Sequence, residues 1–355
     1  MVVEKQIQRI ITMASTNNAL FWGLAGAGAL VALNAWLSTS RKTDFRGKTI
    51  VITGGSRGLG LVTARQLAQE GANIAICARD EAELEAARAE LLPYSGHILA
   101  EPCDVSNQAD VDRFFDSVRS QLGPVDVLIN VAGIIVLTPL ENATDDDFRE
   151  AMDINFWGAY YCINAVLPDM RRRGAGRIVN VASLGGKVAA PHLLPYVTSK
   201  FALVGYSEGL RTELTRHNIF VTTVCPGLIR TGSTRQTLVR GQHEKEYAWF
   251  KTADSLPGLS VSAESCARDL INGCRYGRPE VIVSVPAQVA AVVQGVAPNL
   301  MAEILTAINY ALPGPATGHT NERKLGKESE SAASKTVFTT LTDEAAEQNN
   351  QMVHR

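Results

Sequence analysis

The sequence predicts an α/β protein in which a doubly wound parallel sheet of about seven strands carries helices on both faces. Short apolar runs rich in Val and Ile alternate with longer segments of helical periodicity between residues 48 and 285. A glycine-rich turn follows the first apolar run, and polar residues suited to chemistry follow later runs. Because the carboxyl ends of parallel strands meet at one edge of a sheet, we expect these residues to share one site.

The first predicted strand, residues 48–52, leads into the turn T-G-G-S-R-G-L-G at residues 53–60 and then into a helix. A dinucleotide-binding turn requires this order of strand, glycine turn and helix. Glycines let the backbone approach a pyrophosphate, and the helix N-terminus favours its negative charge. Because Gly54, Gly58 and Gly60 are not spaced as G-x-G-x-x-G, a turn that merely closes a strand–helix corner is the alternative.

The other elements alternate along the chain. Further strands are predicted at 73–77, 98–101, 126–130, 178–182, 221–225 and 281–285, and helices at 61–70, 80–92, 109–122, 145–173 and 196–217. No strand is predicted between residues 232 and 262.

Ser183 follows the fifth predicted strand, and Tyr196 and Lys200 open the next helix. At i,i+4 on a helix, Tyr196 and Lys200 share one face. A phenol exchanges protons near neutral pH only if its pKa falls from about 10, and a nearby ammonium favours the phenolate. Ser183 can bind the oxygen of a carbonyl or alcohol while Tyr196 exchanges its proton. Y-x-x-x-K alone is a weak signal, and the upstream glycine turn gives it weight.

With these two motifs the chain resembles the short-chain dehydrogenase/reductase family, in its common T-G-x-x-x-G-x-G and Y-x-x-x-K form, over residues 47–285. The resemblance implies a Rossmann-type fold and a nicotinamide-dependent oxidoreductase. It also implies that Asn155 completes a catalytic tetrad with Ser183, Tyr196 and Lys200 by holding a proton-relay water, and that Lys200 binds the nicotinamide ribose.

Further segments match the family in order and imply cofactor contacts. Cys103-Asp104-Val105 resembles the segment that contacts adenine, and residues 130–133 resemble the N-N-A-G strand end, with Val131 as a departure. Pro226-Gly227 and Thr231 resemble the turn at the nicotinamide carboxamide. The implied cofactor-binding residues are Gly54, Ser56, Arg57, Gly58, Leu59, Gly60, Arg79, Asp104, Val105, Asn130, Ala132, Gly133, Tyr196, Lys200, Pro226, Gly227 and Thr231.

Charge at the end of the second strand favours NADP. Relatives that prefer NAD usually place an acid there to hold the ribose 2′-OH, whereas this chain has Ala78 followed by Arg79. Together with Arg57 in the glycine turn, Arg79 offers two guanidiniums to a 2′-phosphate. The alternative is that Arg79 is a solvated surface charge and Asp80 binds the ribose.

Composition excludes several other classes. The net charge of −2 gives no sign of the basic surface that binds nucleic acids. With 355 residues, of which 46% are hydrophobic, the chain can bury a large core. The six cysteines form no C-x-x-C pair, which predicts buried thiols in a reducing compartment. No histidines have metal-ligand spacing, so no metal site is predicted.

The regions outside the core predict four parts: an N-terminal segment 1–42, a catalytic domain 43–285, an apolar helical extension 286–312 and a disordered tail 313–355. Residues 19–37 carry no charge and approach the length needed to cross a bilayer. We expect them to anchor the chain in a membrane; a cleaved signal peptide and a buried core helix are the alternatives. The two apolar helices of 286–312, broken at Pro298, would lie on the membrane or at a subunit interface.

Orientation follows from the flanking charges. Four cations (Arg41, Lys42, Arg46 and Lys48) follow the apolar segment, whereas Lys5 and Arg9 precede it. The positive-inside rule then places the catalytic domain in the cytoplasm.

In the family, the interval between residues 232 and 262 forms a mobile cover over the substrate. Its aromatic residues here, Tyr247, Trp249 and Phe250, either line a pocket or pack the cover onto the core. The loops expected around the substrate, 134–137, 184–186 and 192–194, are mostly apolar. A hydrophobic ketone or aldehyde, lipid-, steroid- or retinoid-like, fits them.

The sequence therefore predicts an NADP(H)-dependent oxidoreductase at the membrane that interconverts a carbonyl and an alcohol. Reduction is the favoured direction, because NADPH is usually kept reduced in the cytoplasm. The alternative is a non-catalytic NADP-sensing or scaffolding protein of the same fold, which the intact tetrad disfavours. A homodimer and a homotetramer both remain open.

Overall fold

The computed structural model describes residues 28, 36–95, 97–316, 321–335 and 339–352. The chain divides into two compact units, Met1–Thr43 and Asp44–Arg355. In the first unit residues 36–40 are helical, and the predicted anchor Ala19–Leu37 lies almost entirely outside the described residues. Within the described ranges, no helix has both the length and the apolar character needed to cross a membrane.

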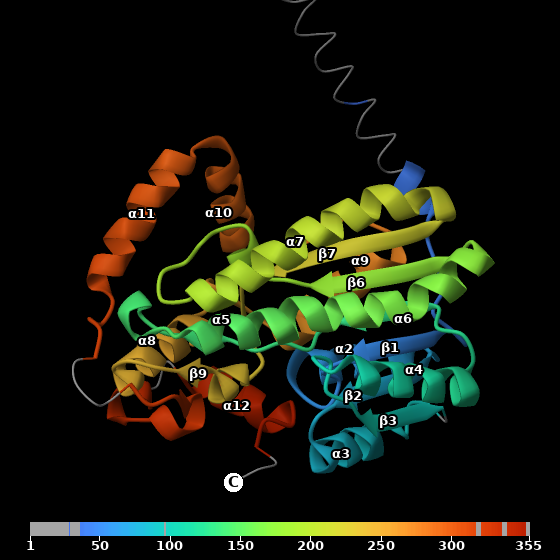
Figure 1. The fold of residues 1–355 in the computed structure, drawn as a ribbon, viewed down its shortest axis with the longest axis horizontal. Coiled ribbons are helices and arrows are strands. Elements are labelled where there is room, and N and C mark those ends of the chain that lie inside the picture. The colour runs from blue at the N-terminus through green and yellow to red at the C-terminus, as the bar shows by residue number, and fades with distance from the viewer. Residues whose placement is uncertain (1–27, 29–35, 96, 317–320, 336–338, 353–355) are drawn as a thin grey trace, which may run out of the picture. The chain divides into compact units, whose positions relative to one another are not determined.

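Seven parallel strands form the central sheet of the second unit (Figure 1). They are β1 (Thr49–Thr53), β2 (Asn73–Ala78), β3 (Ile98–Pro102), β4 (Val127–Asn130), β6 (Gly176–Val181), β7 (Ile219–Pro226) and β11 (Glu280–Val283). Their order, β11-β7-β6-β4-β1-β2-β3, reverses direction between β1 and β4, where ligands bind in doubly wound sheets. The predicted seven-stranded parallel sheet is confirmed.

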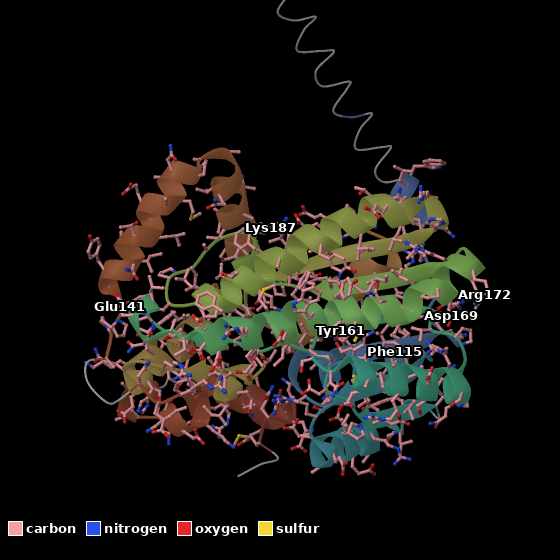
Figure 2. All side chains as sticks on the ribbon, viewed as in Figure 1. Phe115, Glu141, Tyr161, Asp169, Arg172 and Lys187 are labelled. Carbon is pink, nitrogen blue, oxygen red and sulfur yellow. The ribbon has the colours of Figure 1, made fainter. Side chains whose placement is uncertain are left out.

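Helices cover the two faces of this sheet. One face carries α2 (Gly58–Gln69), α3 (Glu81–Leu91) and α9 (Ala263–Arg275), and the other, in front in Figure 1, carries α4 (Gln108–Leu122), α6 (Gly158–Arg173) and α7 (Leu194–Leu214). Successive strand residues point to opposite faces, so Ile50 and Ile52 join the first core while Val51 joins the second. Figure 2 labels Phe115 of α4 and Tyr161 of α6, which belong to that second core.

The long helical segment predicted at 145–173 is interrupted. It consists of α5 (Asp145–Met152), a π-helical turn (Asp153–Trp157) and α6. Thr144 caps α5 in a capping box with Asp147. The π turn carries Asn155, and such turns are frequent at functional sites.

Short elements surround the carboxyl edge of the sheet. They comprise β5 (Val136–Leu137), β8 (Leu228–Arg230), β9 (Leu238–Val239), α8 (His243–Ser255), β10 (Ser260–Ser262), β12 (Lys324–Leu325), α12 (Thr340–Gln348), and the 3₁₀ turns Leu140–Asn142, Leu184–Gly186, Ser233–Gln236, Gly326–Ser329 and Ala332–Ser334. A further 3₁₀ turn, Thr215–His217, joins α7 to the start of β7 at the opposite edge. β12-β9-β5 and β10-β8 form two small sheets. The prediction of no strand between 232 and 262 was therefore wrong, because strands of two or three residues carry no readable periodicity.

The apolar extension forms two helices, α10 (Val285–Val296) and α11 (Pro298–Ala311), which meet at Pro298 as predicted. Their apolar side chains are largely exposed: Val292 is 61%, Val296 78% and Tyr310 87% exposed. Figure 1 shows the pair standing away from the sheet. The two helices thus present an apolar surface that the described part of the chain does not cover.

The prediction of a disordered tail was wrong for residues 321–335 and 339–352. These residues form β12, two 3₁₀ turns and α12, which pack against α8 and β9 (red in Figure 1). Glu330 pairs with Arg235 at 2.9 Å, and Lys251, which is nearly fully buried, pairs with Asp343 at 2.7 Å. Composition did not reveal this order because polar contacts with α8 and its neighbours, rather than an apolar stripe, hold much of the segment.

Candidate active site

A cavity of about 720 Å³ lies at the carboxyl edge of the sheet. The glycine turn, the ends of β2, β4, β6 and β7, and the start of α7 supply its walls. The structure thereby brings together the predicted residues Gly54, Ser56, Arg57, Gly58, Leu59, Gly60, Arg79, Asp104, Val105, Ala132, Gly133, Ser183, Tyr196, Lys200, Pro226, Gly227 and Thr231. The side chains of Asn130 and Asn155, also predicted, do not line it.

The glycine turn is too tightly packed for side chains. Gly54 has φ +66°, and a Cβ there would lie 2.8 Å from the Cα of Ala132. A Cβ on Gly60 would lie 2.1 Å from the carbonyl oxygen of Gly54. Backbone packing therefore requires glycine at these two positions. The amides of Leu59 and Gly60 at the start of α2 are oriented as a pyrophosphate requires, so the residues present fit a dinucleotide.

Ser183 and Tyr196 both line the cavity. Ser183 follows β6, where its Oγ accepts a hydrogen bond from the Gly185 amide at 2.9 Å. Burial raises the pKa of Tyr196 to about 12, and the hydrogen bond with the Ser183 hydroxyl offsets part of that rise. The prediction of a lowered Tyr196 pKa is therefore not met in the protein alone, because loss of solvent outweighs the neighbouring groups.

Lys200 lies beneath the tyrosine ring. Its Nζ donates to the Val181 carbonyl at 3.1 Å and stands 5.7 Å from the centroid of the Tyr196 ring. Burial lowers the pKa of Lys200 to about 8. A Cβ on Gly133 would lie 2.7 Å from Asn155 Oδ1 and 3.4 Å from this Nζ, so the glycine chiefly leaves room for the asparagine side chain.

Lys187, labelled in Figure 2, fixes the loop behind Ser183. Its Nζ lies 2.6 Å from carboxylate oxygens of both Glu208 on α7 and Glu280 on β11. Burial alone would lower the pKa of Lys187, but hydrogen bonds to the two glutamates raise it to about 12. The loop is thus tied to a helix and to a strand.

Asn155 couples two walls of the cavity. Its Oδ1 accepts from the Ile134 amide at 2.9 Å, and its Nδ2 donates to the Ile134 carbonyl at 3.0 Å and to Ser199 Oγ at 2.9 Å. Ser199 in turn donates to the Tyr196 carbonyl at 2.7 Å. Ser199, one residue before Lys200, was not predicted; the signal was a small hydroxyl three positions after the tyrosine.

Asn130 lies within the sheet. Its Nδ2 donates to Asn180 Oδ1 at 2.9 Å, and Asn180 donates to Ser207 on α7 at 3.0 Å. The amides of Val131 and Ala132 instead donate to Thr53 Oγ1, each at 3.2 Å. Backbone contacts carry this strand end, which explains why valine is accommodated at position 131.

Together, the glycine turn, the Ser183–Tyr196 pair and the buried Lys200 match the motif set that the sequence predicted. A profile of the short chain dehydrogenase family matches residues 48–240. The chain belongs to the short chain dehydrogenase family.

Individual relatives of known name include several reductases. 17-beta-hydroxysteroid dehydrogenase 13 from Rattus norvegicus is 28% identical over 300 residues, covering 83% of this chain and 94% of that protein. Ketoacyl reductase HetN from Nostoc sp. is 32% identical over 243 residues, covering 68% and 80%. Among solved structures, L-sorbose reductase from Gluconobacter frateurii, complexed with NADPH and L-sorbose, superposes with a TM-score of 0.60 at 28% identity, covering 68% of this chain and 97% of that one.

The end of the cavity near Arg57 and Arg79 holds a carboxylate that sequence reasoning missed. Glu83, on the first turn of α3, accepts from Ser56 Oγ at 3.0 Å and pairs with Arg57 at 2.5 Å. Asp80 caps α3 by accepting from the Glu83 amide at 2.9 Å. Arg79 is exposed at the cavity rim. Arg57 is therefore partly neutralised by Glu83, and Arg79 is the more accessible of the two cations.

The aromatic residues of the cover, residues 232–262, were predicted either to line a pocket or to pack the cover onto the core, and the structure shows both roles. Phe250 lines the cavity, whereas Tyr247 is fully buried beneath the cover. Trp249 donates its indole hydrogen to the buried Glu246 at 2.8 Å, and the same carboxylate lies 2.9 Å from His192 Nδ1. Glu246 thus joins α8 to the loop before α7.

The cover also carries Asp254, which sequence reasoning missed. Burial raises its pKa to about 7, although contacts with the Ile229 amide, Arg230 and Thr342 lower it in part. Leu325, Lys327 and Gln351 of the C-terminal segment line the cavity as well.

The six cysteines are buried free thiols, as predicted. Over the described ranges, no group of three His, Cys, Asp or Glu side chains is arranged to hold a metal ion.

Proposed function

We propose that the protein is an NADP(H)-dependent reductase that converts a hydrophobic ketone or aldehyde to the alcohol. The observation that carries this proposal is that the hydroxyl side chains of Ser183 and Tyr196 line one cavity together with the glycine turn. Oxidoreductases of the family transfer a hydride, and the site offers the acid that a carbonyl needs at the same moment.

The bound nicotinamide would supply the hydride. Ser183 would donate a hydrogen bond to the substrate oxygen and polarise the carbonyl. With its pKa raised to about 12, Tyr196 is a protonated phenol at neutral pH, the state that can donate a proton to the developing alkoxide. Lys200, held by the Val181 carbonyl, would stabilise the phenolate that remains.

Asn155 positions these groups. In the described geometry its carboxamide is used by Ile134 and Ser199, so its side chain braces the catalytic helix. A relay water, as implied by the family resemblance, would then be held by the backbone of the π turn. Gly54, Gly58, Leu59 and Gly60 would receive the pyrophosphate at the start of α2.

NADP is favoured over NAD by the exposed Arg79 at the end of β2. The family binds NAD(P), and the L-sorbose reductase that superposes on this chain was solved with NADPH. Glu83 would repel a 2′-phosphate unless Arg57 stays between the two anions. Arg79 is accordingly the residue on which we base the preference.

The substrate class follows from the cavity walls. Apolar residues dominate the end near Tyr196, namely Ile134, Ile135, Val188, Ala190, Leu193 and Phe250. Asp254, the acid of this wall, has a pKa raised to about 7 by burial. A hydrophobic carbonyl fits better than an anion, and the relatives named for steroid and acyl substrates support the same class.

Residues 19–37 would anchor the protein in a membrane with the catalytic domain on the cytoplasmic side. The exposed apolar residues of α10 and α11 support a membrane-facing surface, since exposed patches of this kind mark interaction sites. A homodimer or homotetramer that covers the same helices is the other arrangement compatible with their exposure.

Activity decides between this proposal and a non-catalytic NADP sensor. Purified protein should oxidise NADPH in the presence of long-chain aldehydes, steroid ketones or retinal, followed by loss of absorbance from the reduced nicotinamide. Tight NADPH binding with no turnover across such a panel would support the sensor instead.

A further inference from the structure

The C-terminal segment 321–352 crosses from the cover to the glycine turn. At one end, β12 pairs antiparallel with β9, and the Gly326 amide donates to the Thr237 carbonyl at 2.8 Å. A Cβ on Gly326 would lie 2.1 Å from the Thr234 carbonyl oxygen, so the two backbone segments pack too closely to admit a side chain at this position. The first part of the segment is thereby built into the cover.

The middle of the segment is held by buried polar contacts. Glu330 pairs with Arg235, and Thr342 Oγ1 lies 2.6 Å from Ser255 Oγ in the interior. α12 passes so close to Gly232, which has φ +78°, that a Cβ there would lie 2.3 Å from the Ala346 Cα. Buried hydrogen-bonded contacts of this kind order a segment that composition alone would leave open.

The far end reaches the cofactor turn itself. The Gly58 amide, the first in α2, donates to the Asn349 carbonyl at 2.9 Å. Asn350 Nδ2 donates to the Ser56 carbonyl at 2.8 Å and to the Glu83 carbonyl at 3.2 Å. Asn349 and Asn350 are therefore hydrogen-bonded to the turn that the family uses to bind the pyrophosphate.

Gln351 lies at the cavity wall with unused hydrogen-bonding capacity. Its side chain is only 5% exposed, and its Nε2 lies 2.9 Å from where a Cβ of Gly58 would be. Its Oε1 is buried without a hydrogen-bond partner in the described part of the chain. A buried amide oxygen without a partner is costly, and a ligand in the cavity would relieve that cost.

We propose that residues 321–335 and 339–352 form a strap over the phosphate end of the dinucleotide site, and that Gln351 is a direct ligand of the bound dinucleotide. A carboxamide can accept from a ribose hydroxyl and donate to a phosphate oxygen. The cavity keeps about 720 Å³ with the strap in place, so the strap forms a wall of the site. The amides of Leu59 and Gly60 remain as donors at the helix start.

The strap has a kinetic consequence, which rests on the proposed cofactor. A dinucleotide that contacts both α2 and Gln351 would have to break the contact with the strap as it leaves. Weakening these contacts should therefore act mainly on the dissociation rate, as most changes at a binding surface do.

Stopped-flow fluorescence of NADPH tests this with three variants of the full chain. Gln351→Ala removes the proposed ligand. A chain ending at Gln348 removes all the contacts of Asn349, Asn350 and Gln351 with the glycine turn. Gln348→Ala is the control, because that side chain is exposed. We expect NADPH to dissociate roughly tenfold faster from Gln351→Ala, and faster still from the shortened chain, with the control unchanged. Thermal unfolding checks that each variant is folded.

Hydrogen exchange gives a second readout without turnover. NADPH should slow amide exchange across residues 340–352 in the wild-type protein but not in Gln351→Ala. Dissociation rates within twofold of wild type for both Gln351→Ala and the shortened chain would overturn the strap. Faster association and tighter binding in the shortened chain would also overturn it, because the segment would then be a plug.

Failure of the proposed activity is distinguishable from failure of the strap. A protein that releases NADPH faster when the strap is cut, yet reduces no carbonyl, contradicts the activity and supports the strap. A wild-type chain that binds neither NADPH nor NADH contradicts both.

Discussion

Glu83 and Arg57 form an ion pair of 2.5 Å where the sequence predicts a site for the 2′-phosphate. The same carboxylate accepts from Ser56, so the side chains of Ser56 and Arg57 in the glycine turn are both bound by α3. A phosphate placed there must share Arg57 with Glu83. In the proposed cofactor site, preference would therefore depend most on Arg79, which is exposed at the cavity rim after β2.

Arg79→Asp should weaken NADPH binding far more than NADH binding. The carboxylate would repel the 2′-phosphate and accept from the 2′-hydroxyl of NADH. Dissociation constants from fluorescence titration measure both effects. Arg171→Asp, at an exposed position on α6, is the charge-matched control. Equal losses for the two cofactors would show that Arg79 is only a surface charge.

Asp254 should make stability depend on pH in the opposite sense to an ordinary ion-paired carboxylate. Its pKa is raised from 3.8 to about 7 by burial, so the folded state holds the proton more tightly than the unfolded state. Its stabilising contribution is complete below pH 4 and is lost as pH rises through 7.

Asp254→Asn cannot titrate, so its melting temperature relative to wild type should be higher at pH 8 than at pH 5. Differential scanning fluorimetry across that range measures the difference. Asp116→Asn, whose side chain is 73% exposed, should show no such trend. A pH-independent difference for Asp254→Asn would mean that the carboxyl is ionised throughout.

Membrane association should depend on residues 1–42 and on the faces of α10 and α11. A chain lacking 1–42 should be only partly released from the membrane fraction, because the exposed apolar helices remain. Adding Val289→Glu and Leu300→Glu, both more than half exposed, should complete the release. Thr212→Glu, on the exposed side of α7, is the control.

Full-length protein that is monodisperse without detergent would contradict the anchor. A chain lacking 1–42 that is soluble but dimeric, and becomes monomeric with the two glutamates, would show that the helices form a subunit interface.

The sheet and the main helices were predictable because their signals are local. β1 and β4 each contain three consecutive apolar residues, at 50–52 and 127–129, and the glycines of residues 54–60 can be read without knowing the fold. Tyr196 and Lys200 share a helix face by spacing alone, so their meeting at the cavity also followed from the sequence.

What could not be predicted depends on contacts between distant segments. Glu83 reaches the glycine turn from α3, and Asn350 reaches it from a region whose composition resembles a disordered tail. The pKa of Tyr196 depends on how completely the cover excludes water, which the Y-x-x-x-K spacing does not encode. The hydrogen bond that the Ile134 amide donates to Asn155, on the π turn, likewise joins segments distant in the sequence.

The central claim is that Tyr196 is the proton donor for carbonyl reduction. Tyr196→Phe keeps the ring and removes the exchangeable proton, and Tyr206→Phe, on the same helix, is the matched control. Steady-state reduction of a hydrophobic aldehyde, together with NADPH binding by fluorescence, tests the claim most directly. We predict that Tyr196→Phe lowers kcat by at least about 10²-fold, with NADPH affinity retained and the control near wild type. A Tyr196→Phe protein that turns over at close to the wild-type rate would contradict it.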